Sequence, residues 1–171
     1  IHPKNPDILF VAAQGALYGP NEDRGVFKSV DGGASWSKVL YINNLTGCAE
    51  LSMDYNNPLV MYAAMWEHQR LPWKVISGGA GSGLYKTADG GKTWNKIHNG
   101  FPAGKLGRIA IAVAPSDVNI LYSVIECEKD SQWRQAIGKQ MAENNPHLRK
   151  SQASGSFNIF FFPLCFGCTV Y

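Results

Sequence analysis

The chain has 171 residues, of which 45% are apolar and 17% are charged, and its formal net charge is +3. The charged share is below the roughly 25% of an ordinary soluble domain. So mild a positive charge argues against a nucleic-acid-binding domain, which needs clustered Lys and Arg. Four cysteines are too few for a disulfide scaffold, and the length predicts about one domain.

The first residues form a Pro-containing turn that leads directly into a strand-like run at 8–13. They are not a signal peptide, because no long apolar run follows a basic start. We therefore expect an internal start, with the true N-terminus of a longer parent upstream.

A twelve-residue motif occurs twice, at 25–36 and at 83–94, with an offset of 58 residues. The copies read Gly-Val-Phe-Lys-Ser-Val-Asp-Gly-Gly-Ala-Ser-Trp and Gly-Leu-Tyr-Lys-Thr-Ala-Asp-Gly-Gly-Lys-Thr-Trp, so half of the positions are identical. A strand-like motif occurs three times, around Phe10, Tyr62 and Tyr122, at offsets of 52 and 60. Such self-similarity is typical of repeat architectures.

The repeat unit reads as four short strands, each rich in Val, Ile, Tyr, Leu or Met and bounded by turn residues. In the complete unit we place them at about 49–54, 59–66, 83–88 and 93–97. A four-stranded antiparallel unit with a period of about 40–60 residues is typical of a β-propeller blade. The sequence predicts an all-β fold over 1–126, a partial β-propeller with one complete blade and two partial blades.

The Asp-Gly-Gly segments predict tight hairpin turns. We expect each Asp to accept backbone N–H bonds, each Gly pair to allow the chain reversal, and each Trp to be buried between blades. The structural set is Ser29, Asp31, Gly32, Gly33, Trp36, Thr87, Asp89, Gly90, Gly91 and Trp94. The alternative is that Asp31 and Asp89 are catalytic acids or calcium ligands. It is disfavoured because an active site is a single group of residues, whereas this motif occurs once in each blade.

The pattern Ser/Thr-x-Asp-Gly-Gly-x-Ser/Thr-Trp resembles the Asp-box, or bacterial neuraminidase repeat. Segments such as Tyr62-Ala63-Ala64-Met65-Trp66 resemble glycosyl-hydrolase-like and sortilin-like propeller proteins. The resemblance covers 1–126 and implies a fragment of a secreted or periplasmic glycosyl-hydrolase-like parent. Such a fragment would be carbohydrate-directed, would depend on further blades of the parent, and would not be catalytically competent alone. The alternative is a sortilin-like protein-binding or scaffolding propeller without catalysis.

Two connections, 14–24 and 67–82, are expected at the end away from the Asp-Gly-Gly turns. The second is about 16 residues long, and long loops are often functional. Glu67 with Glu22 or Asp23 is the candidate catalytic pair, since a glycosidase needs two carboxylates about 5–9.5 Å apart. The candidate ligand-binding residues combine aromatic rings with polar groups: Trp66, His68, Arg70, Trp73, Arg24, Arg108 and Tyr18. A surface loop that packs against a neighbouring blade is the alternative.

No cofactor or metal is expected. The glycine-rich run 78–83 precedes a strand, whereas a dinucleotide loop precedes a helix. Cys165 and Cys168 have C-x-x-C spacing without a second ligand pair nearby. His2, His68, His98 and His147 share no metal-ligand spacing.

The amino-acid composition of the chain changes after Glu126. Residues 127–150 are polar with helix-compatible spacing, and residues 151–171 carry no charge and hold five of the eight phenylalanines. We expect this aromatic tail to be disordered or aberrant. Its apolar part is about 15 residues, short of the roughly 20 that a spanning helix needs, so a membrane anchor is not expected.

Overall fold

The computed structural model describes residues 1–102, 104–115 and 117–127 in full, together with the backbone of residues 164–165. Within these residues the strands are β1 (Leu9–Ala13), β2 (Gly25–Ser29), β3 (Ser37–Leu40), β4 (Thr46–Met53), β5 (Met61–Leu71), β6 (Lys74–Ser77), β7 (Gly83–Thr87), β8 (Asn95–Ile97), β9 (Leu106–Val113), β10 (Ile120–Cys127) and β11 (Leu164–Cys165). No helix that is long and apolar enough to cross a membrane occurs in the described part of the chain.

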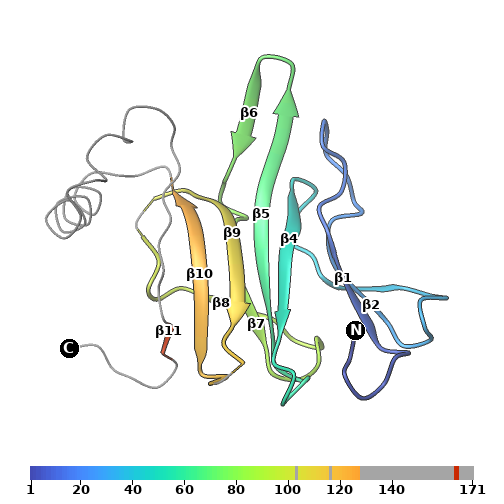
Figure 1. Cartoon of the computed structure of the whole chain (residues 1–171). Helices are drawn as coiled ribbons and strands as arrows, with labels where there is room; N and C mark the ends of the chain where they lie inside the picture. Colours follow the sequence, from blue (N-terminus) through green and yellow to red (C-terminus); the bar gives the residue numbers. More distant parts are fainter. Residues whose placement is uncertain (103, 116, 128–163, 166–171) are drawn as a thin grey trace, which may run out of the picture.

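The strands form three neighbouring antiparallel sheets (Figure 1). The first is β1-β2-β3, the middle one runs β4-β5-β7-β8 with β6 paired to β5, and the third is β9-β10 with β11 on its edge. β1 and β2 lie against β4, and β9 lies against β4 and β5. The middle sheet is one complete four-stranded blade between two partial ones, which confirms the predicted all-β, partial-propeller class.

The beginning of β5, residues 61–65, is buried on both faces. Successive side chains of a strand point to opposite sides. Tyr62 and Ala64 therefore pack into a core with Ile109, Ile111, Leu121 and Ile125 of the third sheet. Ala63 and Met65 pack into a second core with Val26 and Leu40 of the first sheet. A continuous apolar run bounded by turn signals is the pattern of such a strand.

Residues 67–82 do not form the long loop that the sequence predicted. β5 continues to Leu71 and pairs with β6 as a hairpin in which His68 lies opposite Ser77 and Leu71 opposite Lys74. Pro72 suits a tight turn because its φ is fixed, and the β-branched residues that follow it favour a strand. We call this hairpin, residues 67–77, the arm; it projects beyond the other strands in Figure 1. Only the glycine-rich residues 78–82 remain a loop.

The Asp-Gly-Gly turns are held by short-range hydrogen bonds. The Asp31 carboxylate accepts the Ser35 N–H at 2.9 Å and the Ser29 hydroxyl at 2.7 Å, and the Ser29 hydroxyl oxygen accepts the Gly33 N–H at 2.8 Å. Asp89, Thr87 and Thr93 repeat this pattern in the second turn. Gly32 and Gly33 have φ of 71° and 96°, a region that side chains disfavour.

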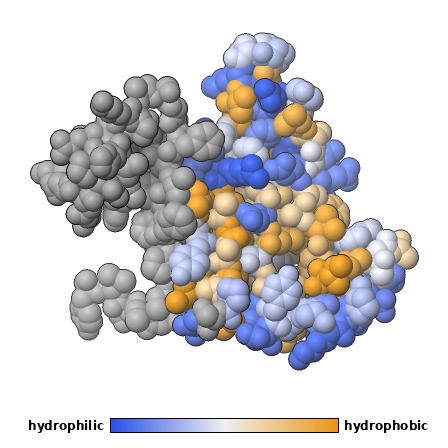
Figure 2. Space-filling model, viewed as in Figure 1, coloured by the Kyte–Doolittle hydropathy of each residue, from blue (hydrophilic) through white to orange (hydrophobic). Residues whose placement is uncertain are grey.

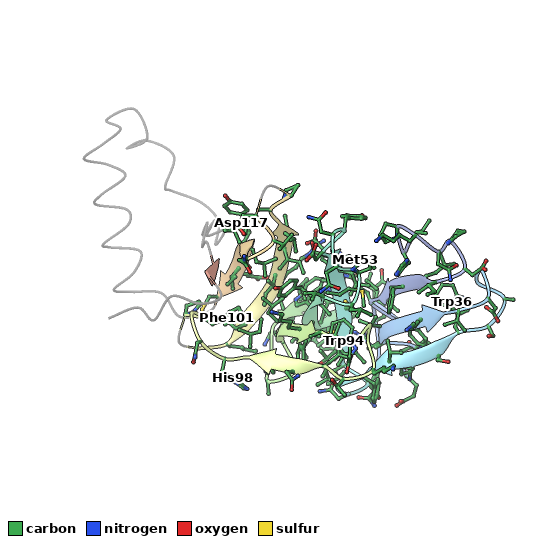
Figure 3. The ribbon with its side chains drawn as sticks, turned by 90° about the horizontal axis from the view of Figure 1, so that it is seen from below. Trp36, Met53, Trp94, His98, Phe101 and Asp117 are labelled. Atoms are coloured by element: carbon green, nitrogen blue, oxygen red, sulfur yellow. The ribbon has the colours of Figure 1, made fainter. Side chains whose placement is uncertain are left out.

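Both turns lie at the same end of the sheets as the β4–β5 connection. The Gly90 N–H donates to the Leu59 carbonyl at 2.9 Å, and the Gly90 carbonyl accepts a hydrogen bond from the Lys28 ammonium, near the end of β2, at 2.9 Å. We call this the turn end, and the opposite end the arm end. The two tryptophans differ from each other, and only Trp36 departs from the expected burial between blades. Trp94 packs against the core shared with the first sheet, but Trp36 is 42% exposed. Figure 3 shows Trp94 near the middle of the molecule and Trp36 beside the outer sheet.

The change in composition near residue 127 coincides with the end of the described range 117–127. β10 ends at Cys127, and Ile120 and Leu121 of β10 pair with the backbone of β11. Apart from these residues, the predicted polar segment 127–150 and aromatic tail 151–171 lie outside the described residues.

Truncating a buried side chain of β5, the strand that is covered on both faces, tests the packing. Met65 is fully buried, so Met65→Ala should lower the free energy of unfolding by about 2–5 kcal/mol through lost contacts and a cavity. Val30→Ala, at a site 65% exposed, is the control and should cost about 0.5 kcal/mol or less. Urea denaturation measures both. Equal effects from the two variants would contradict the buried position of Met65.

The turn carboxylates predict acid sensitivity. Hydrogen bonds from the Ser35 hydroxyl, the Ser35 amide and the Ser29 hydroxyl lower the pKa of Asp31 to about 2, because they favour the charged form. The stability that Asp31 contributes is then complete above the unfolded pKa of about 3.9 and is lost as the pH falls toward about 2. NMR titration of the carboxyl carbons should find a raised Asp31 pKa in Ser35→Ala. An unchanged pKa in that variant would refute the assignment.

Candidate functional site

The arm end brings the two predicted connections together. The Arg70 N–H donates to the Leu17 carbonyl at 2.9 Å, and the Gln69 amide donates to the Tyr18 carbonyl at 3.5 Å. Residues 14–24 therefore lie along the arm, and the two segments form one continuous surface.

Four strands meet around Trp66 at the base of the arm. The Trp66 Nε1–H donates to Ser77 Oγ at 3.0 Å, and the Ser77 hydroxyl donates to Glu126 Oε2 at 2.6 Å. The same Glu126 oxygen accepts the Arg108 backbone N–H at 3.0 Å. The Arg108 guanidinium lies 5.6 Å from the Trp66 ring centroid. The ring centroids of Trp66 and His68 lie 4.1 Å apart. We call these five residues the Trp66 cluster.

His68 is held as a neutral imidazole at neutral pH. Partial burial lowers its pKa, and the positive charges of Arg24 and Arg70 lower it further, whereas the negative charge of Glu126 raises it. A neutral imidazole has one donor and one acceptor nitrogen, which suits hydrogen bonds to hydroxyl groups.

Arg24 is only 1% exposed. Its guanidinium donates to the carbonyls of Leu45 at 3.0 Å, Ala16 at 2.5 Å and Gly19 at 3.3 Å. The same burial lowers its pKa from the ordinary arginine value. These bonds fix the shape of the 14–24 connection, so the role that the geometry supports for Arg24 is to hold the loop and not to touch a ligand.

Glu67 lies against the glycine-rich loop. Its Oε2 accepts the Gly81 N–H at 3.0 Å, and its own backbone N–H donates to Ser82 Oγ at 3.0 Å. A Cβ at Gly79 would lie 2.1 Å from the Glu67 carboxyl carbon, so glycine makes room for the carboxylate in this position. Glu67 therefore fixes the return from the arm to β7.

The other two candidate carboxylates belong to the first sheet's side of the molecule. Glu22 Oε2 accepts the Tyr41 hydroxyl at 2.7 Å, and the Asp23 N–H donates to the Asn21 side chain at 2.9 Å. No hydrogen bond within the described residues joins Glu67 to either one. The catalytic pairing stays a prediction.

Glu126 and Ser77 were missed as site residues by the sequence reasoning. A signal existed, because the 60-residue offset that relates Tyr62 to Tyr122 also relates Trp66 to Glu126. A carboxylate thus stands where the preceding repeat has tryptophan. A Cβ at Gly107 would lie 2.5 Å from Glu126 Oε2, so glycine on β9 makes room for this carboxylate.

Exposed aromatic residues complete the arm end. Trp73 at the tip of the arm is 80% exposed, and Tyr18 in the neighbouring connection is 71% exposed. Apolar residues lie among hydrophilic ones on the arm (Figure 2). Within the described residues, no group of three or more His, Cys, Asp or Glu side chains could hold a metal ion.

No protein-family description matches the chain, and no curated protein matches it. Among solved structures, a GH74 enzyme of Niastella koreensis covers 74% of the chain at 22% identity with a TM-score of 0.48. An ancestral GH74 enzyme covers 75% of the chain at 17% identity with a TM-score of 0.49. The chain spans 16% and 15% of the lengths of these two proteins.

The charge around His68 can be tested directly. Glu126→Gln should lower the pKa of His68 further, because the negative charge that favours the imidazolium is removed. Asp117→Asn, at the turn end, is the matched control and should leave this pKa unchanged. NMR titration of the imidazole measures both, and an unchanged or raised pKa in Glu126→Gln would contradict the geometry. Since the folded pKa lies below the ordinary value of about 6.5, stability should fall as the pH drops below about 6.5.

Proposed function

We propose that this chain binds carbohydrate at the arm end, as part of a glycosyl-hydrolase-like propeller. The observation that carries the proposal is the Trp66 cluster, where an indole, a neutral imidazole and hydrogen-bonding groups from four strands converge. Binding sites for small ligands typically combine aromatic surface with a few fixed polar groups. The exposed rings of Tyr18 and Trp73 extend this surface along the arm.

The resemblance of the repeats to Asp-box propellers adds support from the sequence. In the chain as described, the Asp-Gly-Gly turns lie at the turn end and the candidate binding residues at the arm end. The turns therefore act in folding, and the arm end is left for recognition. The same resemblance leaves a sortilin-like, protein-binding function as the alternative.

The proposal is one of binding. Turnover by Glu67 with Glu22 or Asp23 would need two carboxylates placed on either side of a glycosidic bond, and the contacts of Glu67 are with its own loop. A glycosidase activity of the longer parent stays a prediction.

Exposed aromatic residues give the sharpest test, because their truncation leaves the core intact. Tyr18→Ala and Trp73→Ala should each weaken binding to an oligosaccharide panel of cellohexaose, xylohexaose and mannohexaose by about two- to tenfold, since a ring that stacks contributes about 0.5–1.5 kcal/mol. Tyr55→Ala is the matched control, because Tyr55 is 70% exposed at the turn end. Isothermal titration calorimetry on the full chain measures binding, and near-UV circular dichroism checks that each variant is folded. If the folded chain binds none of the glycans, the carbohydrate proposal fails and a protein ligand becomes the better hypothesis.

A further inference from the structure

A bulge in β4 turns a carboxylate toward the third sheet. The register of β4 against β5 shifts between Cys48 and Glu50, so that Ala49 is an extra residue on β4. Successive side chains of a strand point to opposite faces, and one extra residue reverses this alternation. Cys48 and Leu51 therefore both pack into the core shared with the first sheet. Glu50 lies opposite Ala64, which belongs to the core shared with the third sheet.

Glu50, and Ser52 two residues further on, bind the backbone of β9. Glu50 Oε2 accepts the Ile111 N–H at 3.1 Å, and Ser52 Oγ accepts the Val113 N–H at 3.2 Å. Both bonds join residues that are 61 positions apart, so the two bonds follow each other in step along β4 and β9. We call these two hydrogen bonds the latch.

The latch holds the side of β9 that has no strand partner. Within the described residues, β9 pairs with β10 on one side and with no strand on the other. Ile111 is only 6% exposed, and a backbone N–H in such a place needs an acceptor. The apolar core between β5 and β9 gives cohesion without direction, whereas a hydrogen bond requires its donor and acceptor to be aligned. The latch therefore fixes the position of β9 along β4 and β5.

Arg108 lies on β9 three residues before Ile111. Its guanidinium lies 5.6 Å from the ring centroid of Trp66 on β5, a cation–π distance. The Arg108 backbone N–H donates to Glu126 of β10 at 3.0 Å. This part of β9 is thus held to β10 by Glu126 and to β4 by the latch. A displacement of β9 along β5 would move the guanidinium away from the ring.

We propose that Glu50 is a positioning residue for the carbohydrate site at the arm end. By binding the Ile111 N–H, Glu50 sets β9 in the place where Arg108 is held against Trp66, and Ser52 assists at the next outward N–H. This inference rests on the proposed carbohydrate function. It adds that a residue outside the Trp66 cluster, on the bulge of β4, controls the geometry of that cluster.

Two replacements of similar length separate the hydrogen bond from packing. Glu50→Gln keeps a side-chain oxygen that can accept the Ile111 N–H, whereas Glu50→Met lacks this oxygen. Amide hydrogen exchange followed by NMR on the full 171-residue chain should show the Ile111 amide exchanging about two- to tenfold faster in Glu50→Met, the size of one ordinary hydrogen bond. Exchange of this amide should be unchanged in Glu50→Gln, and the amides of β2 should be unchanged in both variants.

A second NMR readout reports the position of Arg108. Aromatic ring currents shift the signals of protons that lie over a ring, so the Arg108 side-chain protons should be shifted upfield by Trp66. This upfield shift should shrink in Glu50→Met and persist in Glu50→Gln. If Glu50→Met does not fold, Ser52→Ala removes the other acceptor of the latch, and its effect is measured on the Val113 amide and on the same Arg108 protons.

Glycan affinity links the latch to the site. In isothermal titration calorimetry with cellohexaose, xylohexaose and mannohexaose, Glu50→Met should bind about two- to tenfold more weakly than the unmodified chain. Glu50→Gln should bind as the unmodified chain does, because it restores the acceptor.

The outcomes separate this inference from the function on which it rests. Equal Arg108 shifts in the two Glu50 variants overturn the inference and leave carbohydrate binding standing. A displaced Arg108 in Glu50→Met with unchanged glycan affinity also overturns it. Binding of no glycan by the unmodified chain overturns the proposed function, and the NMR readouts then still decide whether Glu50 positions Arg108.

Discussion

The burial of residues 61–65 on both faces is the constraint on which the rest of the structure depends. Tyr62 and Ala64 face one neighbouring sheet, and Ala63 and Met65 face the other. Because these small and medium side chains fill two cores at once, β5 fixes the spacing between three sheets. Neither neighbouring sheet has a complete blade of its own in the described chain, so each depends on β5 and its partners for its buried face.

The same strand creates the candidate site. β5 runs from the double core to Leu71, beyond the ends of its neighbours. Trp66 is the first residue after the buried stretch, and it lies where β6, β9 and β10 also contribute side chains. The rigid half of β5 thus sets the position of the arm, and hydrogen bonds through Ser77 and Glu126 tie the base of the arm to the next blade.

The two ends of the molecule differ in how their polar groups are used. At the turn end, Asp31 and Asp89 are engaged by hydroxyl and N–H groups within four residues of them, which makes each turn self-contained. At the arm end, polar groups from distant parts of the sequence meet, and Arg70 and Arg108 remain exposed. This contrast supports the proposal that the turn end serves folding and that the arm end binds a ligand.

The sequence by itself determined what is local: the repeat, the four strands of the complete blade and the Asp-Gly-Gly turns, because strand propensity and turn hydrogen bonds act over a few residues. Only the tertiary structure decided what depends on distant partners. It exposed Trp36 while packing Trp94 against a core, and joined Ser77 to Glu126, which lies 49 residues away. Those outcomes depend on which sheet lies next to which, and no short-range pattern carries that information.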